Sequence, residues 1–161
     1  MEVVLNEMKI KYEDKKIWML RETWGKRTLK NPYWRELKGG VDKGTGYRCV
    51  EINKKDYKYH RVVYFIHNPK WKIHDSCREN IIDHIDRNPL NNNIENLRVV
   101  TNQQNLWNQN AKGYYFNRAS GKYVAQICVD RKKKHLGYFM TAEEAGAAYL
   151  DAKGSLHHIS P

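Results

Sequence analysis

The sequence predicts an α+β protein, with antiparallel β-hairpins in its first part and a small sheet-and-helix unit in its last part. Two observations lead to this prediction: short runs of alternating polarity bounded by turn residues, and a few isolated segments with a helical period. Hydrophobic residues make up 40% of the 161 residues and aromatic residues 12%, which is too much apolar material for a disordered polycation. A chain of this length forms one ordinary domain or two small ones, so small cores are expected.

The strongest functional signal in the composition is a formal net charge of +11 at pH 7. A surface this basic attracts polyanions and supplies non-specific affinity for phosphates. Nucleic acid is therefore the expected partner. Charge alone leaves one alternative open, a basic surface without a nucleic-acid role.

The three cysteines, Cys49, Cys77 and Cys128, are scattered and form no C-x-x-C pair. They indicate neither a disulfide framework nor a cysteine-rich zinc site. No run approaches the ~18 apolar residues that indicate a membrane helix. We therefore expect a cytoplasmic protein without a membrane partner.

The first part of the chain reads as hairpins followed by a short helix. Strands are expected at about Met8 to Tyr12 and Lys16 to Arg21, and a second hairpin turns at Asn53 to Asp56. A helical period then runs from Arg61 to Asn68, where Asn68-Pro69 ends it. The loop from Trp24 to Lys30 is the most plausible additional DNA contact of this part.

The stretch IIDHIDRNPLNNNIENLRVVTNQQN, residues 81–105, contains seven asparagines. Its pattern predicts a strand ending near Ile82, a loop, a second short strand or turn over Ile94 to Arg98, and a helix capped by Thr101. Asparagine tolerates left-handed backbone and caps its own chain. Most of these asparagines are therefore expected to shape the loop, and four of them are assigned only that role: Asn88, Asn91, Asn92 and Asn93.

The remaining residues of this stretch suit phosphodiester hydrolysis. Such a reaction needs an activated water and charge stabilisation, which one histidine and one hard divalent cation can supply. Asp83 and Asn105 offer a carboxylate and an amide oxygen to Mg²⁺ (or Mn²⁺), and His84 offers a base. Because neighbours on a strand point to opposite sides, a bend after Asp83 is expected. Asn96 can hydrogen-bond backbone across the loop and so fix His84.

This arrangement resembles the HNH, or ββα-metal, endonucleases of the phage and homing type. The resemblance rests on DHIDRNPLNNNIENLRVVTNQQN, in which Asn96 lies 12 positions after His84 within an I-E-N-L-R block, and on the upstream YHRVVY. It implies Asp83 and Asn105 as metal ligands, His84 as general base and Asn96 as the residue that holds the loop. It also implies 5′-phosphate and 3′-hydroxyl products.

The last part of the chain predicts three strands and one helix. The strands are expected at about Tyr114 to Asn117, Lys122 to Val129 and Lys133 to Tyr138. The helix TAEEAGAAYLDAKG has a capping box at Thr141 and Glu144, and Gly154 is expected to stop it. His157 and His158 are expected to form a tail rather than a metal site.

Alternation along these strands predicts one face for the alanine-rich helix and one face for DNA. The segments GYYFNRASGKYVAQI and LGYFMTAEEAGAAYLDA resemble the APETALA-type, or ethylene-response-factor-type, DNA-binding domain, which implies that the exposed face of the sheet reads DNA. The candidate DNA contacts are Tyr115, Asn117, Arg118, Lys122, Gln126, Lys133 and His135.

The sequence thus predicts an N-terminal HNH domain with preceding hairpins (residues 1–104), a helix end and linker (105–112) and a DNA-binding domain (113–161). The expected function is site-specific, metal-dependent endonuclease action of a phage or mobile-element type on double-stranded DNA, by a monomer in the host cytoplasm or nucleoid. Two alternatives remain: a non-catalytic DNA-binding regulator on a degenerate HNH scaffold, and an RNA-directed nuclease.

Overall fold

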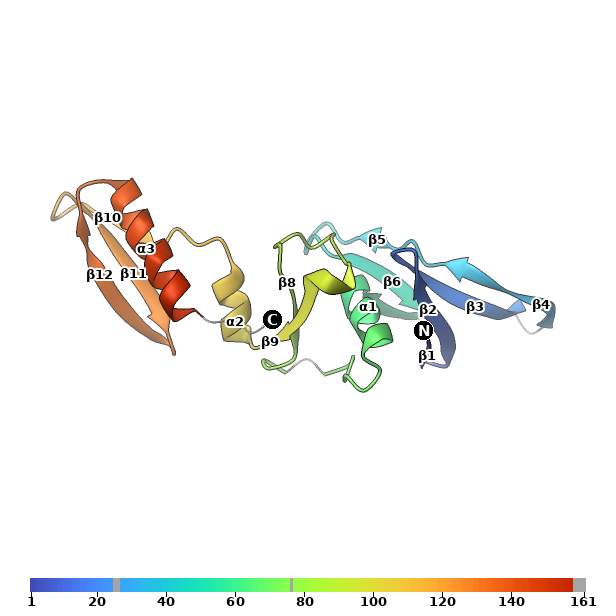
Figure 1. The fold of residues 1–161 in the computed structure, drawn as a ribbon. Helices are drawn as coiled ribbons and strands as arrows, with labels where there is room; N and C mark the ends of the chain where they lie inside the picture. Colours follow the sequence, from blue (N-terminus) through green and yellow to red (C-terminus); the bar gives the residue numbers. More distant parts are fainter. Residues whose placement is uncertain (25–26, 76, 158–161) are drawn as a thin grey trace. The chain divides into compact units, whose positions relative to one another are not determined.

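The computed structural model describes residues 1–24, 27–75 and 77–157. The chain divides into two compact units, Met1–Val99 and Val100–Pro161. The described residues form several small antiparallel sheets and three α-helices (Figure 1). The predicted α+β class is therefore confirmed, whereas the predicted division into residues 1–104, 105–112 and 113–161 stays a prediction.

The first unit begins with a four-stranded antiparallel sheet in the order β1-β2-β3-β4. Its strands are β1 (Glu2–Leu5), β2 (Met8–Glu13), β3 (Lys16–Trp24) and β4 (Arg27–Glu36). The β2–β3 hairpin was predicted, but β1 and β4 were not. Gly25 and Lys26, in the loop predicted to touch DNA, lie outside the described residues.

Four hairpins share one turn chemistry. In each, two consecutive residues have positive φ, as the mirror-image two-residue turn of a hairpin requires. The first residue of each pair is Asn or Asp, the side chains that tolerate this conformation best. The pairs are Asn6–Glu7, Asp14–Lys15, Asn53–Lys54 and Asp130–Arg131.

A second sheet and the helix α1 follow. The sheet contains β5 (Gly40–Val41), β6 (Arg48–Ile52) and β7 (Lys55–Lys58), and α1 spans Tyr59–His67. The helix therefore begins two residues before the predicted Arg61. It buries one side, and the buried hydroxyl of Tyr59 accepts a hydrogen bond from the backbone N–H of Ile17 at 3.0 Å. This bond ties α1 to the four-stranded sheet.

The core of the first unit is formed by residues of both sheets, α1 and the strands that follow. Its fully buried side chains include Ile10, Ile17, Ile52, Val62 and Val63. Ile82 and Leu97 extend the same cluster. They lie on β8 (Ile81–His84) and β9 (Leu97–Val100), which pair in a two-stranded sheet, with the 3₁₀ helix η1 (Ile94–Asn96) just before β9.

The second unit starts with the short helix α2 (Asn102–Asn108). Thr101 and Gln104 form a reciprocal capping box at its beginning, which confirms Thr101 as the predicted cap. A three-stranded antiparallel sheet follows, with strands β10 (Tyr114–Asn117), β11 (Lys122–Val129) and β12 (Lys132–Phe139). The three predicted strands are confirmed, the third extended by one residue at each end.

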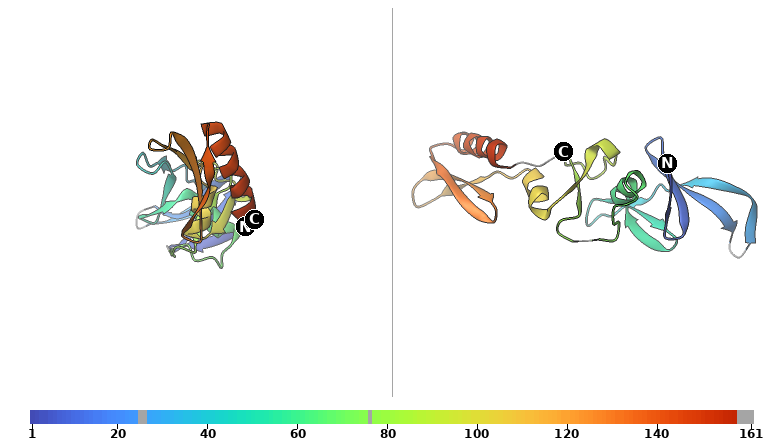
Figure 2. Two further views of the ribbon diagram at one scale, coloured as in Figure 1. Left: turned by 90° about the vertical axis from the view of Figure 1, so that its left-hand side faces the viewer. Right: turned by 60° about the horizontal axis from the view of Figure 1, so that its bottom comes forward.

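Helix α3 (Ala142–Leu156) lies along one face of this sheet (Figure 2). Ala145 and Tyr149 are its buried residues. The helix packs so closely that a Cβ on Gly113, which has φ +71°, would lie 2.0 Å from the Tyr149 ring. The predicted capping box at Thr141 is confirmed, but the predicted stop at Gly154 is wrong, because the helical hydrogen bonds continue to His157, whose N–H donates to the carbonyl of Lys153.

His157, which was predicted to lie in a tail, packs against other residues of the second unit. Its ring stacks on Trp107 with centroids 4.5 Å apart, and its Nε2 lies 3.0 Å from the carbonyl oxygen of Cys128. Lys153 donates to the carbonyl of Gln109 at 2.9 Å. These contacts attach α2 to the sheet and helix of the second unit. His158 lies outside the described residues.

Candidate active site

Asp83 and His84 end strand β8, and each residue is only 5% exposed. The chain turns immediately afterwards, because the N–H of Arg87 donates to the carbonyl of His84 at 2.9 Å. Arg87 has φ +64°, a conformation that non-glycine residues rarely adopt. The backbone therefore bends just after the Asp-His pair, one residue later than the sequence prediction placed it.

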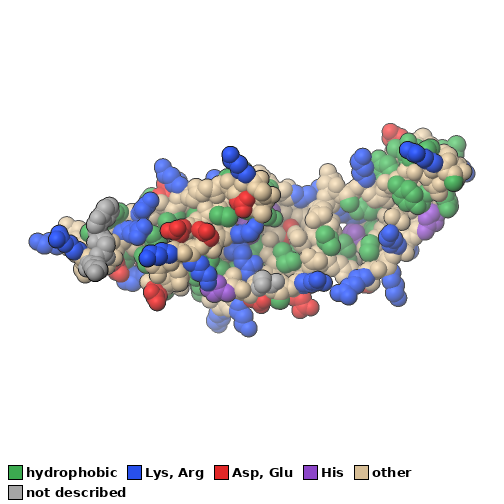
Figure 3. Space-filling model, turned by 180° about the vertical axis from the view of Figure 1, so that it is seen from behind, with side chains coloured by type: hydrophobic (Ala, Val, Ile, Leu, Met, Phe, Trp, Pro, Cys, Tyr) green, Lys and Arg blue, Asp and Glu red, His purple; other side chains and the backbone are tan. Residues whose placement is uncertain are grey.

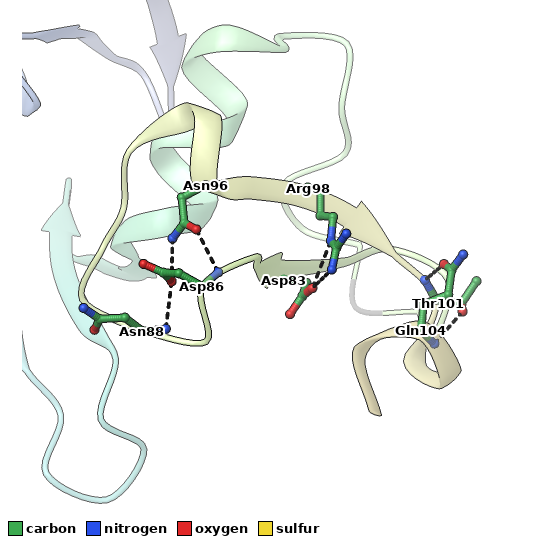
Figure 4. A network of polar contacts seen from close by, with 7 residues as sticks. All are labelled: Asp83, Asp86, Asn88, Asn96, Arg98, Thr101 and Gln104. Carbon is green, nitrogen blue, oxygen red and sulfur yellow. Dashed lines mark hydrogen bonds and ion pairs between the residues drawn. The ribbon is translucent and has the colours of Figure 1, made fainter. Parts of the chain in front are cut away.

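The carboxylate of Asp83 is bound by Arg98 from the neighbouring strand β9. Both Nε and Nη2 of Arg98 donate to Oδ2 of Asp83, at 3.1 and 3.0 Å. The two side chains are 14% and 6% exposed, respectively. A carboxylate so far from water needs a positive partner, and Arg98 supplies that charge (Figure 4).

Asn96 closes the loop that follows His84. Its Oδ1 accepts from the N–H of Asp86 at 3.0 Å, and its Nδ2 donates to Oδ1 of Asp86 and to the carbonyl of Asn91 at 2.9 and 2.8 Å. The carbonyl of Asn96 accepts from the N–H of Ile85. Asn96, the last residue of η1, thus bonds the start and the middle of the loop, and Figure 4 shows its contacts with Asp86.

Asp86 is the acceptor at the centre of this loop. Its carboxylate accepts hydrogen bonds from the side chain of Asn91 and from the backbone N–H of Asn88, in addition to the one from Nδ2 of Asn96. These bonds, the one from Asn91 foremost, hold the pKa of Asp86 below its usual value. Asp86, Asn88 and Asn91 therefore organise the loop, the role predicted for the last two.

The ring of His84 contacts a third asparagine. Its Nε2 lies 3.1 Å from Oδ1 of Asn92, and both residues are buried. Sequence reasoning assigned Asn92 only to loop formation and gave His84 no polar partner from this part of the loop. The stretch itself offered no signal that separates Asn92 from Asn91 or Asn93.

Two further rings surround the imidazole of His84. Tyr47 stacks on it with centroids 5.9 Å apart, and His60 meets it in a T-shaped contact at 5.0 Å. Burial, together with the neighbouring His84, Lys58 and Arg61, lowers the pKa of His60 to about 3, and burial is the largest of these causes. His60 is therefore neutral at physiological pH and serves as packing beside His84.

The predicted metal ligands lie on different units. Asp83 is in the first unit and Asn105 is on α2 in the second, and each unit is described by itself. Their joint binding of an ion stays a prediction. The described residues contain no cluster of three or more His, Cys, Asp or Glu side chains that could hold a metal. One carboxylate and one amide oxygen nevertheless suit Mg²⁺, which keeps several of its waters.

Residues 57–106 match the family model of the HNH endonucleases. We call these residues the HNH segment. It runs from β7 to α2 and contains every residue of the loop network, from Asp83 to Arg98. This part of the chain is therefore similar to the HNH endonucleases.

The rest of the chain stands outside this family match. No curated protein and no solved structure matches the chain. None of the helices in the described ranges is long and apolar enough to cross a membrane. The family match therefore says nothing of the four-stranded sheet that precedes the HNH segment or of the three-stranded sheet that follows it.

The face of the last sheet away from α3 carries the predicted DNA contacts. Cross-strand neighbours there are Asn117 with Lys122, Gln126 with His135, and Cys128 with Lys133. Lys122, Lys133 and His135 are exposed. Tyr115 shares this face, and Arg118 lies exposed in the turn beyond β10. Lys and Arg side chains are spread over the face of the molecule drawn in Figure 3.

Sequence reasoning missed one residue of this sheet face, Tyr138. The register shifts between Ala125 and Gln126, which pair with Gly137 and His135. This bulge moves Tyr138 onto the side of His135, and their rings contact each other at 4.9 Å. Val124 lies between Tyr115 and Tyr138 and is only 4% exposed, although simple alternation placed it on the exposed face.

Proposed function

We propose that the protein is a site-specific DNA endonuclease in which the HNH segment hydrolyses a phosphodiester bond. The observation that carries the proposal is the buried Asp83–His84 pair at the end of β8, inside the segment that matches the HNH endonucleases. Asn96 and the loop that it closes hold this pair in one place. Preorganised groups of this kind are what hydrolysis of a phosphate diester requires.

The roles follow from the chemistry of each group. His84 would accept the proton of the attacking water, as a neutral imidazole can. By the sequence resemblance, Asp83 and Asn105 would be ligands of Mg²⁺ or Mn²⁺, and the ion would supply positive charge for the phosphate and the leaving group. Arg98 orients the carboxylate of Asp83 through its two hydrogen bonds to Oδ2.

The second unit holds the DNA in this proposal. Its exposed sheet face combines cationic side chains with Gln126 and Asn117, which can bond base edges in a major groove. An APETALA-type mode of docking and a phage or mobile-element origin rest on the sequence resemblance alone. The target sequence would be read by this face, while phosphate contacts supply most of the affinity.

The test is cleavage of supercoiled plasmid and of the source genome with Mg²⁺ or Mn²⁺. We expect Asp83→Ala and His84→Ala to abolish cleavage and to leave salt-sensitive DNA binding in place. His74→Ala is the matched control, because His74 is exposed and its ring lies against Tyr57 of β7. Absence of cleavage by the wild-type protein on every DNA, with either ion, would make the endonuclease proposal wrong.

A second candidate is a DNA-binding regulator in which the HNH segment is only a scaffold. One observation favours it: Arg98 already compensates the charge of Asp83, so the carboxylate is stable without a metal. The two candidates differ in one measurement. A regulator never changes the topology of the plasmid, whereas DNA binding that survives Asp83→Ala is expected for both candidates. Competition by duplex RNA at equal salt separates both candidates from an RNA-directed nuclease.

A further inference from the structure

Asn92 is placed to control which nitrogen of His84 carries the proton. Its Oδ1 lies 3.1 Å from Nε2 of His84, and the two residues are 8% and 5% exposed. A hydrogen bond at this distance between buried groups is not exchanged freely for one with water. The contact therefore restricts which nitrogen of the His84 imidazole can carry the proton.

The orientation of the Asn92 amide follows from its second contact. Its Nδ2 donates to the carbonyl oxygen of Leu90 at 3.2 Å. Exchanging the oxygen and nitrogen of the amide would place Oδ1 against that carbonyl, where two acceptors would repel each other. Oδ1 therefore faces His84, and because Oδ1 can only accept, Nε2 of His84 must donate.

The tautomer of the neutral ring is then determined. With the proton on Nε2, the lone pair lies on Nδ1, which becomes the nitrogen that can take a proton from water. A free imidazole exchanges between its two tautomers, so part of the population would present the wrong nitrogen. A ring that is held in one tautomer presents Nδ1 to water in the whole population.

The loop network fixes Asn92 itself. The N–H of Asn92 donates to the carbonyl of Leu90, and the adjoining carbonyl of Asn91 accepts from Nδ2 of Asn96. The backbone that carries Asn92 is therefore tied to Asn96 at the end of η1. Asn96 acts on the ring of His84 by this route, through the loop and the side chain of Asn92.

We propose that Asn92 is a positioning residue that holds His84 in the Nε2–H tautomer and so assigns proton transfer to Nδ1. The catalytic part of this inference rests on the proposed endonuclease function. The hydrogen bond and the tautomer can be tested without it. Asn92 itself touches neither DNA nor metal in this proposal.

The first experiment measures the ¹⁵N shifts of His84 in the metal-free protein at pH 8. We expect the wild-type ring to show a protonated Nε2 and an unprotonated Nδ1. Asn92→Leu removes the acceptor with little change in size, and the ring should then populate both tautomers. Asn92→Asp keeps an acceptor oxygen and should keep the wild-type tautomer. An Nδ1–H tautomer in the wild type overturns the inference.

The second experiment measures cleavage with Mg²⁺ for the same variants. Asn92→Leu should lower kcat by about 10- to 100-fold with little change in KM, the usual effect of losing a residue that orients a functional group. Asn92→Asp should recover part of that loss. Asn93→Ala is the matched control, since the adjacent Asn93 makes no side-chain cap bond to η1.

The two experiments separate failure of this inference from failure of the proposed function. If the wild type cleaves DNA and Asn92→Leu changes neither the tautomer nor kcat, Asn92 does not position His84. If the tautomer responds as expected but the wild type never cleaves, Asn92 still holds the ring and the endonuclease proposal is wrong. If Asn92→Leu fails to fold, Asn92→Asp still tests the inference.

Discussion

Asp83 and Arg98 form a buried ion pair across strands β8 and β9, with Nη2 of Arg98 3.0 Å from Oδ2 of Asp83. Removing one partner leaves the other charge buried without compensation, which costs about 3 kcal/mol or more. We therefore expect Arg98→Ala to lower the free energy of unfolding by about 3 kcal/mol, measured with urea in the absence of metal.

The exposed pair of Lys9 and Glu22 is the control for this prediction. Its atoms lie 3.2 Å apart, but both side chains are 52% exposed. Surface pairs contribute little, so Lys9→Ala should cost no more than about 0.5 kcal/mol. Equal losses for the two variants would contradict the view that burial makes the Asp83–Arg98 pair important.

The elements of the fold that are bounded by capping or turn residues could be predicted from the sequence. Thr101 and Thr141 begin helices by capping boxes that involve only residues three positions apart, so the pattern is complete in the sequence itself. Strands β10 and β11 were likewise predicted with their observed bounds, because turn residues bracket them. Strand β4 was missed because its polar and aromatic residues show no alternation, and pairing with β3 decides its structure.

The candidate site was predictable as a set of residues but not as a network. The spacing of Asp83, His84 and Asn96 identified them, whereas the partners of each residue depend on how the loop turns back. Asn92 differs from its neighbours only in burial, and burial depends on three-dimensional packing. Tyr138 was missed for a related reason: a single bulge reverses the alternation on which the assignment depended.

Asn96 makes three side-chain hydrogen bonds within the loop, two with Asp86 and one with the carbonyl of Asn91. Asn96→Ala should lower the free energy of unfolding by about 2 kcal/mol, because each bond contributes about 1 kcal/mol and part of the loop is open to water. Asn96→Asp should be no better, since it places a second carboxylate against Asp86. Faster hydrogen exchange of the Asp86 amide would locate the effect, and a change confined to distant amides would contradict it.

His60 should make the first unit sensitive to acid. Its pKa is lowered to about 3 in the folded protein, from a usual value of 6.5, mainly because the ring is buried. Between these two values the unfolded chain binds a proton that the folded chain does not. Stability is therefore greatest above pH 6.5 and falls as the pH falls toward 3.

The size of this effect follows from proton linkage. The slope approaches about 1.4 kcal/mol per pH unit, so His60 should cost about 2 kcal/mol between pH 7 and pH 5. The groups that face it, Lys58, Arg61, His84 and the ring of Tyr47, provide no negative charge to offset the cost. Urea unfolding of His60→Asn at both pH values should show a smaller loss than the wild type. An equal loss would assign the acid sensitivity to another group.

The exposed sheet face of the second unit should carry a measurable share of the affinity for DNA. Lys122 and Lys133 are exposed on that face, on neighbouring strands. Each lysine that neutralises one phosphate contributes about 0.9 to the slope of log K against log salt. Lys122→Ala and Lys133→Ala should therefore each weaken binding to all duplexes and lower that slope by about 1, measured by fluorescence anisotropy over a salt series. Lys9→Ala removes the same charge from the first unit and should leave the slope unchanged.

Gln126→Ala should leave the slope unchanged and weaken binding only to the specific target, because its side chain carries no charge and can bond a base edge. An equal loss of slope for the three lysine variants, Lys9→Ala included, would indicate that net charge, and not this sheet face, binds the DNA.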